Sequence, residues 1–343
     1  MSSKTSKKKK KRTKSRALAL KLGFVFAIIL IGWGIAAEWF VHHNRDWIDE
    51  QRSYSPLYAA AMLWLGNPLA DITDGLDLTG YDTVCEYDTV APAGEVFFAG
   101  APVRISNPAP SDIRILDRGE FKIGWSDSLR HPVWCAYHVI KDEKHIVSGR
   151  PGFTKDRAEK AAPTPADYTK SGYDRGHMAP NHAIASRYGK TEQKKTFMMS
   201  NIAPQSPALN RGVWRDIELR IADLWTKRYG EIWVLVGCIS DRDNQETISG
   251  SNIDVPAWYY QIIIAQEDMD VRALAVLFPQ SVGWRDWSAR YIVTIDELEK
   301  LTGLNFNPEL PEFFQKQIEI DRPSRLWPVR KLDIFRQIWL RFL

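Results

Sequence analysis

The chain has 343 residues, of which 44% are hydrophobic and 12% aromatic, so it can form a packed core and is not disordered as a whole. Its formal net charge of +4 depends on residues 1–21, which hold ten basic side chains and no acidic one. Without those ten, 36 basic residues face 42 acidic ones, so residues 22–343 carry a net charge of −6. This division excludes a uniformly basic body, and any binding of nucleic acid there requires local groups.

Residues 1–21 are predicted to form a basic cytoplasmic tail, and residues 22–41 a transmembrane anchor. Residues 22–37 carry no charge, and as a helix they would span about 24 Å. Trp33 and Trp39 lie near the far end, where interfacial aromatic residues are common. A secretory signal peptide with a long basic start fits the same pattern, but the length of the segment favours an uncleaved anchor that contacts membrane lipid.

The two interpretations give the same topology. Basic residues before an apolar segment keep the N-terminus in the cytoplasm, so the body is expected on the non-cytoplasmic side of a single-pass membrane protein. A bacterial inner membrane with a periplasmic body fits this pattern, and a mitochondrial inner membrane is the alternative. The Lys-rich tail is expected to orient the segment and attract anionic lipid rather than bind nucleic acid.

Residues 42–110 predict a juxtamembrane segment and linker, with a short apolar helix at 54–66 and a Pro-, Gly- and Ala-rich stretch at 91–110. Residues 111–312 predict an α+β domain with a mixed or antiparallel sheet, and residues 313–343 a C-terminal extension that ends in an amphipathic segment. Apolar residues at three- and four-residue steps predict a helix over 211–229, stopped by Gly230. Runs rich in β-branched and aromatic residues predict four strands, at 133–140, 232–236, 257–264 and 271–278.

Three cysteines are too few for a disulfide scaffold, and they lack the spacing of a zinc ribbon. Cys85 and Cys135 are the natural pair if one disulfide forms. Cys238 closes an apolar run and is expected to be a buried thiol.

The sequence GYDRGHMAPN at 172–181 holds the first group of candidate catalytic residues. In an extended segment, Arg175 and His177 point to the same face and can address one ligand together. Arginine can clamp a phosphodiester in bidentate fashion. Histidine can take a proton from water at neutral pH. Gly176 allows close approach of the backbone.

The second group lies in SNIAPQSPALNRGVWRDIE at 200–218. Asn210 stands at the start of the predicted helix, and Glu218 follows about two turns later. A single amide oxygen suits Mg²⁺, which keeps several waters and takes oxygens from substrate phosphate. Mn²⁺ also suits oxygen-rich sites. Glu218 could accept hydrogen bonds from the waters of the ion.

These residues resemble the non-specific DNA/RNA endonucleases, the family of DRGH or ββα-metal nucleases that includes endonuclease G and secreted bacterial nucleases. The resemblance covers about residues 110–312 and rests on order and spacing as well as on single motifs. Its segments are DRGH at 174–177, SNIAPQ at 200–205, Leu209-Asn210 with Trp214 and Ile217-Glu218, PVWCAY at 132–137, and ELEKLTGL at 297–304.

The resemblance implies a ββα-metal active site and a role for each matched residue. His177 would be the general base, Asn210 the direct protein ligand of Mg²⁺, and Glu218 the group that orients the waters of the ion. Arg175 would hold a phosphate oxygen, and Asn201 would support catalysis. Products would carry 5′-phosphate ends, and DNA, RNA or both would be substrates. A homodimer and an inhibitor protein are further partners that the sequence leaves open.

The sequence departs from the family pattern at two places, and two other functions remain open. Many members carry an arginine where this chain has Ala222, for which Arg215 and Arg220 are nearby candidates. The family's Gly-Pro is Gly237-Cys238 here. A catalytically silent membrane protein that tethers nucleic acid would explain the missing arginine. A phosphodiesterase acting on a non-polymer substrate would explain the net charge of −6.

Overall fold

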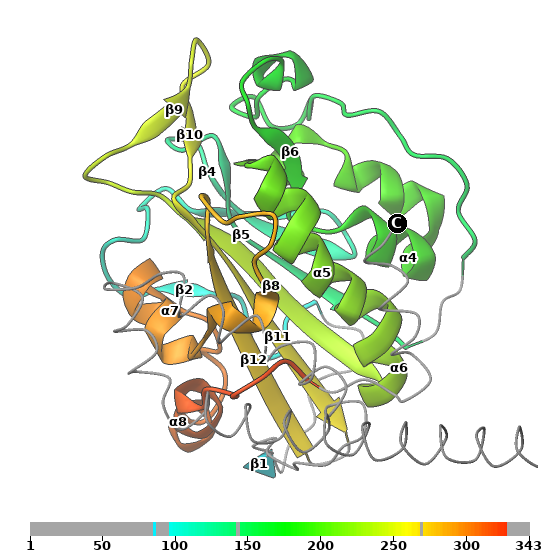
Figure 1. Cartoon of the computed structure of the whole chain (residues 1–343), viewed down its shortest axis with the longest axis vertical. Coiled ribbons are helices and arrows are strands. Elements are labelled where there is room, and N and C mark those ends of the chain that lie inside the picture. The colour runs from blue at the N-terminus through cyan, green and yellow to red at the C-terminus, as the bar shows by residue number, and fades with distance from the viewer. Residues whose placement is uncertain (1–84, 87–95, 142–144, 268–269, 328–343) are drawn as a thin grey trace, which may run out of the picture. The chain divides into compact units, whose positions relative to one another are not determined.

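An antiparallel sheet organises the domain in the computed structural model (Figure 1). The structure describes residues 85–86, 96–141, 145–267 and 270–327, which all belong to one compact unit, Tyr81–Trp327. The sheet has eight strands in the order β1-β12-β11-β8-β5-β4-β3, with β13 beside β12. They are β1 Cys85–Glu86, β3 Arg114–Asp117, β4 Phe121–Ser126, β5 His131–Val139, β8 Glu231–Ile239, β11 Trp258–Glu267, β12 Asp270–Pro279 and β13 Ile292–Val293.

Helices lie over both faces of this sheet. Successive residues of a strand point to opposite faces, and Tyr259 contacts Trp214 whereas the next residue, Tyr260, contacts Phe306. Figure 1 shows the green helices on one face and the orange ones on the other. The first group comprises α4 Asn181–Thr196 and the helical run that begins at Leu209, and the second comprises α7 Ile295–Thr302 and α8 Glu312–Ile320. Double coverage explains why β5 is buried at all nine positions.

The four predicted strands are confirmed as β5, β8, β11 and β12. The predicted helix is confirmed as a helical run that is kinked at Gly212 and ends before Gly230, whose φ of 88° stops it. The run is less regular than the sequence suggests, because two of its turns are π-helical. Its parts are η3 Leu209–Val213, α5 Trp214–Leu219, η4 Arg220–Trp225 and α6 Thr226–Tyr229.

Three strand pairs and three 3-10 turns complete the described elements. The pairs are β6 Asp174–His177 with β7 Ile202–Gln205, β9 Glu246–Ile248 with β10 Ile253–Val255, and β2 Val103–Arg104 with β14 Leu304–Asn305. The 3-10 turns are η1 Pro165–Tyr168, η2 Met199–Asn201 and η5 Ser288–Tyr291.

Both ends of the described region pack more closely than the sequence suggests. Phe98, in the predicted linker, is buried with its ring 5.5 Å from that of Trp233. In the predicted C-terminal extension, Trp327 packs its ring 5.4 Å from Trp225, and its carbonyl accepts a hydrogen bond from the Trp225 indole. Aromatic burial therefore ties both segments to the core.

The predicted tail, the anchor at 22–41, the short helix at 54–66 and the segment at 334–343 lie outside the described residues. Within the described part, no helix combines the length and the apolar character needed to cross a membrane. The candidate disulfide of Cys135 is wrong, because Cys135 is a free thiol. It is fully buried on β5, with its sulfur 3.9 Å from the Asn201 amide oxygen.

Candidate active site

The motif DRGH forms the whole of strand β6, which pairs antiparallel with β7. Arg175 lies opposite Pro204 and Gly176 opposite Ala203. A Cβ atom at Gly176 would lie only 2.2 Å from the Gln205 side-chain oxygen, so this position requires glycine. The helical run begins at Leu209, four residues after β7, and this short connection brings it beside the motif.

A cavity of about 600 Å³ lies between β6, the start of α4 and the helical run. Four of the five sequence-predicted residues line it, namely Arg175, His177, Asn210 and Glu218. Extended geometry therefore does turn Arg175 and His177 toward one space, as their spacing predicts.

His177 is held in an aromatic surrounding. Its ring centroid lies 4.8 Å from that of Phe197 and 5.3 Å from that of Phe153. Burial, and secondarily the positive charge of Arg150, lower the pKa of His177 to about 3. Within the described part of the chain, its buried Nε2 atom has no hydrogen-bond partner. The ring is therefore neutral at physiological pH and able to accept a proton.

Asp174 fixes the orientation of the Asn210 amide. Asn210 Nδ2 donates a hydrogen bond to Asp174 Oδ2 at 2.9 Å, and Arg211 donates two, at 2.6 and 2.7 Å, to the same carboxylate. Since an ionised carboxylate only accepts, the nitrogen of the amide must face Asp174. The Asn210 oxygen remains for the cavity, and a neutral oxygen there fits Mg²⁺, which keeps most of its waters.

Trp214 fixes the Glu218 carboxylate, because Trp214 Nε1 donates a hydrogen bond to Glu218 Oε1 at 3.0 Å. Burial raises the pKa of Glu218 to about 8, although the hydrogen bond from Trp214 and the charge of Arg215 act to lower it. A divalent cation in the cavity would favour the ionised form. The donor set formed by Asn210 and Glu218 therefore fits a hydrated divalent cation.

Arg175 lies in the lining of the cavity, whereas Asn201 lies outside it. The Arg175 guanidinium lines the cavity but also donates to the Pro165 carbonyl at 2.6 and 3.2 Å, which leaves its other N–H groups for a ligand. Asn201 is only 1% exposed and does not line the cavity. Its side chain bonds to both backbone groups of Ala179 and to the Thr196 carbonyl, so it positions the chain that follows His177.

The cavity is locally basic. Because the body has a net negative charge, a phosphate-binding site in it needs such a local group of basic side chains. Its lining includes four guanidinium groups against the carboxylates of Asp174 and Glu218. The four are Arg150, Arg175, Arg211 and Arg215.

The sequence gives no signal for Arg150 and Phe153, which reach the cavity from a segment distant from the motifs. Thr154 anchors this segment, because its N–H donates to the Phe197 carbonyl at 3.0 Å and its carbonyl accepts from Met199 N–H at 2.9 Å. His182 also lines the cavity and lies 2.9 Å from Asp223. Such long-range contacts leave no local pattern in the sequence.

The departure at Ala222 does not remove a cation from the cavity. Ala222 is 1% exposed and does not line the cavity, and its carbonyl accepts a hydrogen bond from the buried guanidinium of Arg187. Of the two suggested substitutes, Arg215 lines the cavity, whereas Arg220 is buried and pairs with Asp216 at 3.2 Å.

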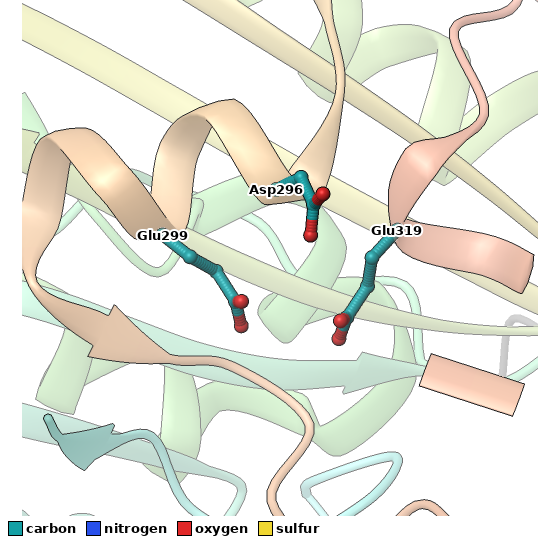
Figure 2. Close-up of side chains that lie close together, drawn as sticks. All are labelled: Asp296, Glu299 and Glu319. Carbon is teal, nitrogen blue, oxygen red and sulfur yellow. The ribbon is translucent and has the colours of Figure 1, made fainter. Parts of the chain in front are cut away.

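A separate carboxylate cluster lies on α7 and α8, where Figure 2 shows Asp296, Glu299 and Glu319 turned toward one another. One oxygen of each lies within 4.8 Å of the others. Two of the three have hydrogen-bond donors, since Glu319 accepts from Asn307 at 2.9 Å and Glu299 from Phe306 N–H at 2.8 Å. Burial raises the pKa of Glu319 to about 7 and that of Glu299 above its usual value. These hydrogen bonds join α7 and α8 to the adjacent residues Phe306 and Asn307, and none of these residues lines the cavity.

Comparisons with known proteins agree with this geometry. A family model described as DNA/RNA non-specific endonuclease matches residues 100–313. The mitochondrial nuclease EXOG of Xenopus laevis is 30% identical over 236 residues, which are 64% of this chain and 62% of that protein. The nuclease of Serratia marcescens is 31% identical over 211 residues, 59% of this chain and 78% of that protein.

The fold has a solved counterpart in a structure titled as a complex of EndoG with EndoGI that describes EndoG inhibition. The TM-score is 0.53 at 22% identity, with 60% of this chain and 88% of that chain covered. The matches to EXOG from Xenopus laevis, Mus musculus and Danio rerio span only 55–62% of those proteins.

Proposed function

We propose, because this chain belongs to the DNA/RNA non-specific endonuclease family, that it is a metal-dependent endonuclease. It hydrolyses phosphodiester bonds of DNA, RNA or both with little sequence specificity and leaves 5′-phosphate ends. The observation that carries the proposal is the shared cavity of about 600 Å³. A neutral His177 and the oriented amide of Asn210 line it together with four arginines.

The residues of the chain divide the work as follows. The neutral His177 ring takes a proton from the attacking water. Arg175 and Arg215 hold non-bridging phosphate oxygens and keep the phosphodiester in position. Asn210 would hold Mg²⁺, or Mn²⁺, by its amide oxygen, and Glu218 would orient the waters around that ion. When bound, the ion would supply Lewis-acid stabilisation of the charge that develops on the leaving oxygen.

Two other functions receive less support. A silent tether of nucleic acid would not need a neutral histidine and an oriented metal ligand in one cavity. A phosphodiesterase for small substrates would not need four guanidinium groups around the site, whereas a polyanion does.

A cleavage assay with the full chain tests the proposal. Plasmid DNA and RNA are incubated with Mg²⁺, with Mn²⁺, or with EDTA, and the ends are analysed. Cleavage should require the metal, and His177→Ala should reduce it about 10²- to 10⁴-fold, the usual contribution of a general base. Metal-independent cleavage, or full activity of His177→Ala, would contradict the proposal.

We further propose that residues 22–41 anchor the protein in a membrane, with the nuclease domain on the non-cytoplasmic side. The ten basic residues at 1–21 support this orientation. The body would face the periplasm in a bacterium or lie at the mitochondrial inner membrane, and relatives of both kinds occur, from Serratia marcescens and from mitochondria. Carbonate extraction and protease protection of membranes test this, and release by carbonate would overturn it.

Two partner proposals remain open to test. The complex of EndoG with EndoGI supports the expectation of an inhibitor protein for this chain. A homodimer would be measured by light scattering of the purified chain.

A further inference from the structure

A second cavity, of about 500 Å³, lies near the end of β8 and shares no lining residue with the first. Cys238 lines it, with hydroxyl groups from Ser128 and Ser240, the Asp112 carboxylate and the Arg242 guanidinium. The cavity therefore offers a cysteine sulfur beside both positive and negative groups.

His131, on β5, lies directly behind this cysteine. Its Nδ1 is 3.4 Å from the Cys238 sulfur, and its Nε2 is 3.0 Å from Asp254 Oδ2. Asp254 is further fixed by the Ser240 hydroxyl and by the Gln245 amide at 2.9 Å. A nucleophile, an imidazole and an orienting carboxylate thus follow one another, which is the arrangement that activates a nucleophilic side chain.

The hydrogen bonds assign the charge of the imidazole. Nδ1 lies 2.8 Å from the Pro132 carbonyl oxygen, which can only accept, so Nδ1 carries a proton. Nε2 faces an ionised carboxylate, so it carries a proton as well. Burial lowers the pKa of His131, but the Cys238 sulfur and the Asp254 carboxylate outweigh it and raise the pKa to about 10.

Among the residues that line the second cavity, Arg242 carries a positive charge, and its guanidinium donates to the Pro108 carbonyl. Three buried phenols interact electrostatically with Cys238, and burial raises the pKa of each well above its usual value, so they are neutral. The Arg130 guanidinium donates to the carbonyls of Ala161 and Ser251. The phenols are those of Tyr168, Tyr259 and Tyr260, and the charged groups at the cavity wall are Asp112, Asp241 and Arg242.

We propose that Cys238 is a thiol-modification site, in which His131 and Asp254 activate the sulfur for exchange with small disulfides that enter the second cavity. In the structure the thiol donates to the Pro132 carbonyl at 3.0 Å. His131 Nδ1 is 3.4 Å from the sulfur, so its N–H can donate to the sulfur as it attacks a disulfide.

The exchange step balances without a further oxidant. The Cys238 thiolate attacks one sulfur of the small disulfide, and the bond between its two sulfurs breaks. The leaving thiolate carries away the electron pair and takes a proton from water. One disulfide is consumed, and one mixed disulfide on Cys238 is formed.

The test measures the rate at which the full chain reacts with 4,4′-dithiodipyridine, a small neutral disulfide whose released thiopyridone absorbs light. Peptide mapping by mass spectrometry then assigns the label. Cys135 is the internal control, because it is a buried thiol, 0% exposed against 4% for Cys238, and its contact is the Asn201 amide oxygen. Cys238 should react at least about tenfold faster than Cys135 at pH 7.

Two variants separate activation from simple access. His131→Asn should slow the labelling of Cys238 about tenfold or more at pH 6, and less at pH 8, where an ordinary thiol ionises more readily. If His131→Asn does not fold, Asp254→Asn takes its place, because it keeps the shape of the side chain. It should also slow the labelling of Cys238. Labelling of Cys238 only after unfolding would overturn the proposal, and so would an unchanged rate in a folded variant.

Discussion

Two groups of polar side chains in this domain resemble metal sites but differ in charge. One is a cluster of three acids, and the other is a cavity with four arginines in its lining. The carboxylate cluster brings Asp296, Glu299 and Glu319 together with one oxygen of each within 4.8 Å of the others. The catalytic cavity offers one oriented amide and one buried acid, with four arginines in its lining. A polyanionic substrate is repelled by the first group and attracted by the second. For the proposed cleavage of phosphodiesters, the number of carboxylates is therefore a poor guide to the site of the metal.

The largest expected effect comes from removing the proposed amide ligand of the metal. Asn210→Ala should reduce metal-dependent cleavage by at least about 10²-fold, because the Lewis-acid contribution amounts to several kcal/mol. Cleavage of plasmid is measured against Mg²⁺ concentration. The matched control replaces all three acids of the carboxylate cluster by their amides and should stay within about twofold of the wild type. If the control lost as much metal-dependent cleavage as Asn210→Ala, the carboxylate cluster would be needed for the reaction and the contrast with the cavity would be wrong.

A smaller effect is expected from the group behind the ligand. Asp174→Asn replaces the carboxylate that fixes the Asn210 amide and holds Arg211. The amide could then turn its nitrogen toward the cavity, and we expect the Mg²⁺ concentration for half-maximal cleavage to rise about 10- to 100-fold. Arg211→Gln removes the same ion pair but leaves the carboxylate facing Asn210, so it should cause a smaller shift. Equal shifts in the Mg²⁺ concentration for half-maximal cleavage would show that the charge of the ion pair, and not the orientation of the Asn210 amide, causes the effect.

The sequence predicts only part of the difference between the carboxylate cluster and the cavity. The order of the DRGH motif, Asn210 and Glu218 is visible in the sequence, and a short connection joins β7 to the start of the helical run. The pairing of β6 with β7 is not local, because α4 lies between them in the chain. Runs rich in β-branched and aromatic residues likewise predict the four long strands. The contributions of Arg150 and Phe153 depend instead on the hydrogen bonds of Thr154 with Phe197 and Met199, which no local pattern records.

Two residues also show how spacing misleads. Asn201 lies close in sequence to the site but is turned inward to satisfy Ala179, because a buried backbone needs partners. Cys135 was the natural disulfide candidate by spacing, yet it lies fully buried as a free thiol in the central sheet. The pairing of Cys238 with His131 and Asp254 joins three different strands and could not be read from their positions.

The carboxylate cluster is expected to affect stability rather than catalysis. The pKa of Glu319 is about 7 in the folded state, against 4.5 for the ordinary group, so the folded protein binds the extra proton between these values. Stability should therefore fall as pH rises from 4.5 to 7, by up to about 3 kcal/mol. Glu319→Gln, which retains the acceptor for Asn307, should raise the melting temperature at pH 8 and change it little at pH 4.5.

The same melting curves test whether the cluster holds a cation. Addition of Mg²⁺ or Ca²⁺ at pH 8 should leave the difference between wild type and Glu319→Gln unchanged. A melting temperature that rises with the cation in the wild type but not in the variant would make the cluster a binding site and weaken the contrast with the cavity.

The smallest effect is expected at the edge of the cavity, where Arg215 lies exposed. Arg215→Gln should weaken DNA binding a few-fold and reduce the slope of log affinity against log salt by about 1, as loss of one phosphate contact does. Binding is measured in Ca²⁺ or EDTA to prevent cleavage. Lys316→Gln makes the same charge change on α8, which packs over the opposite face of the sheet, and should leave the slope unchanged. Because the body is negative overall, equal slopes for the two variants would mean that attraction to nucleic acid is not local to the cavity.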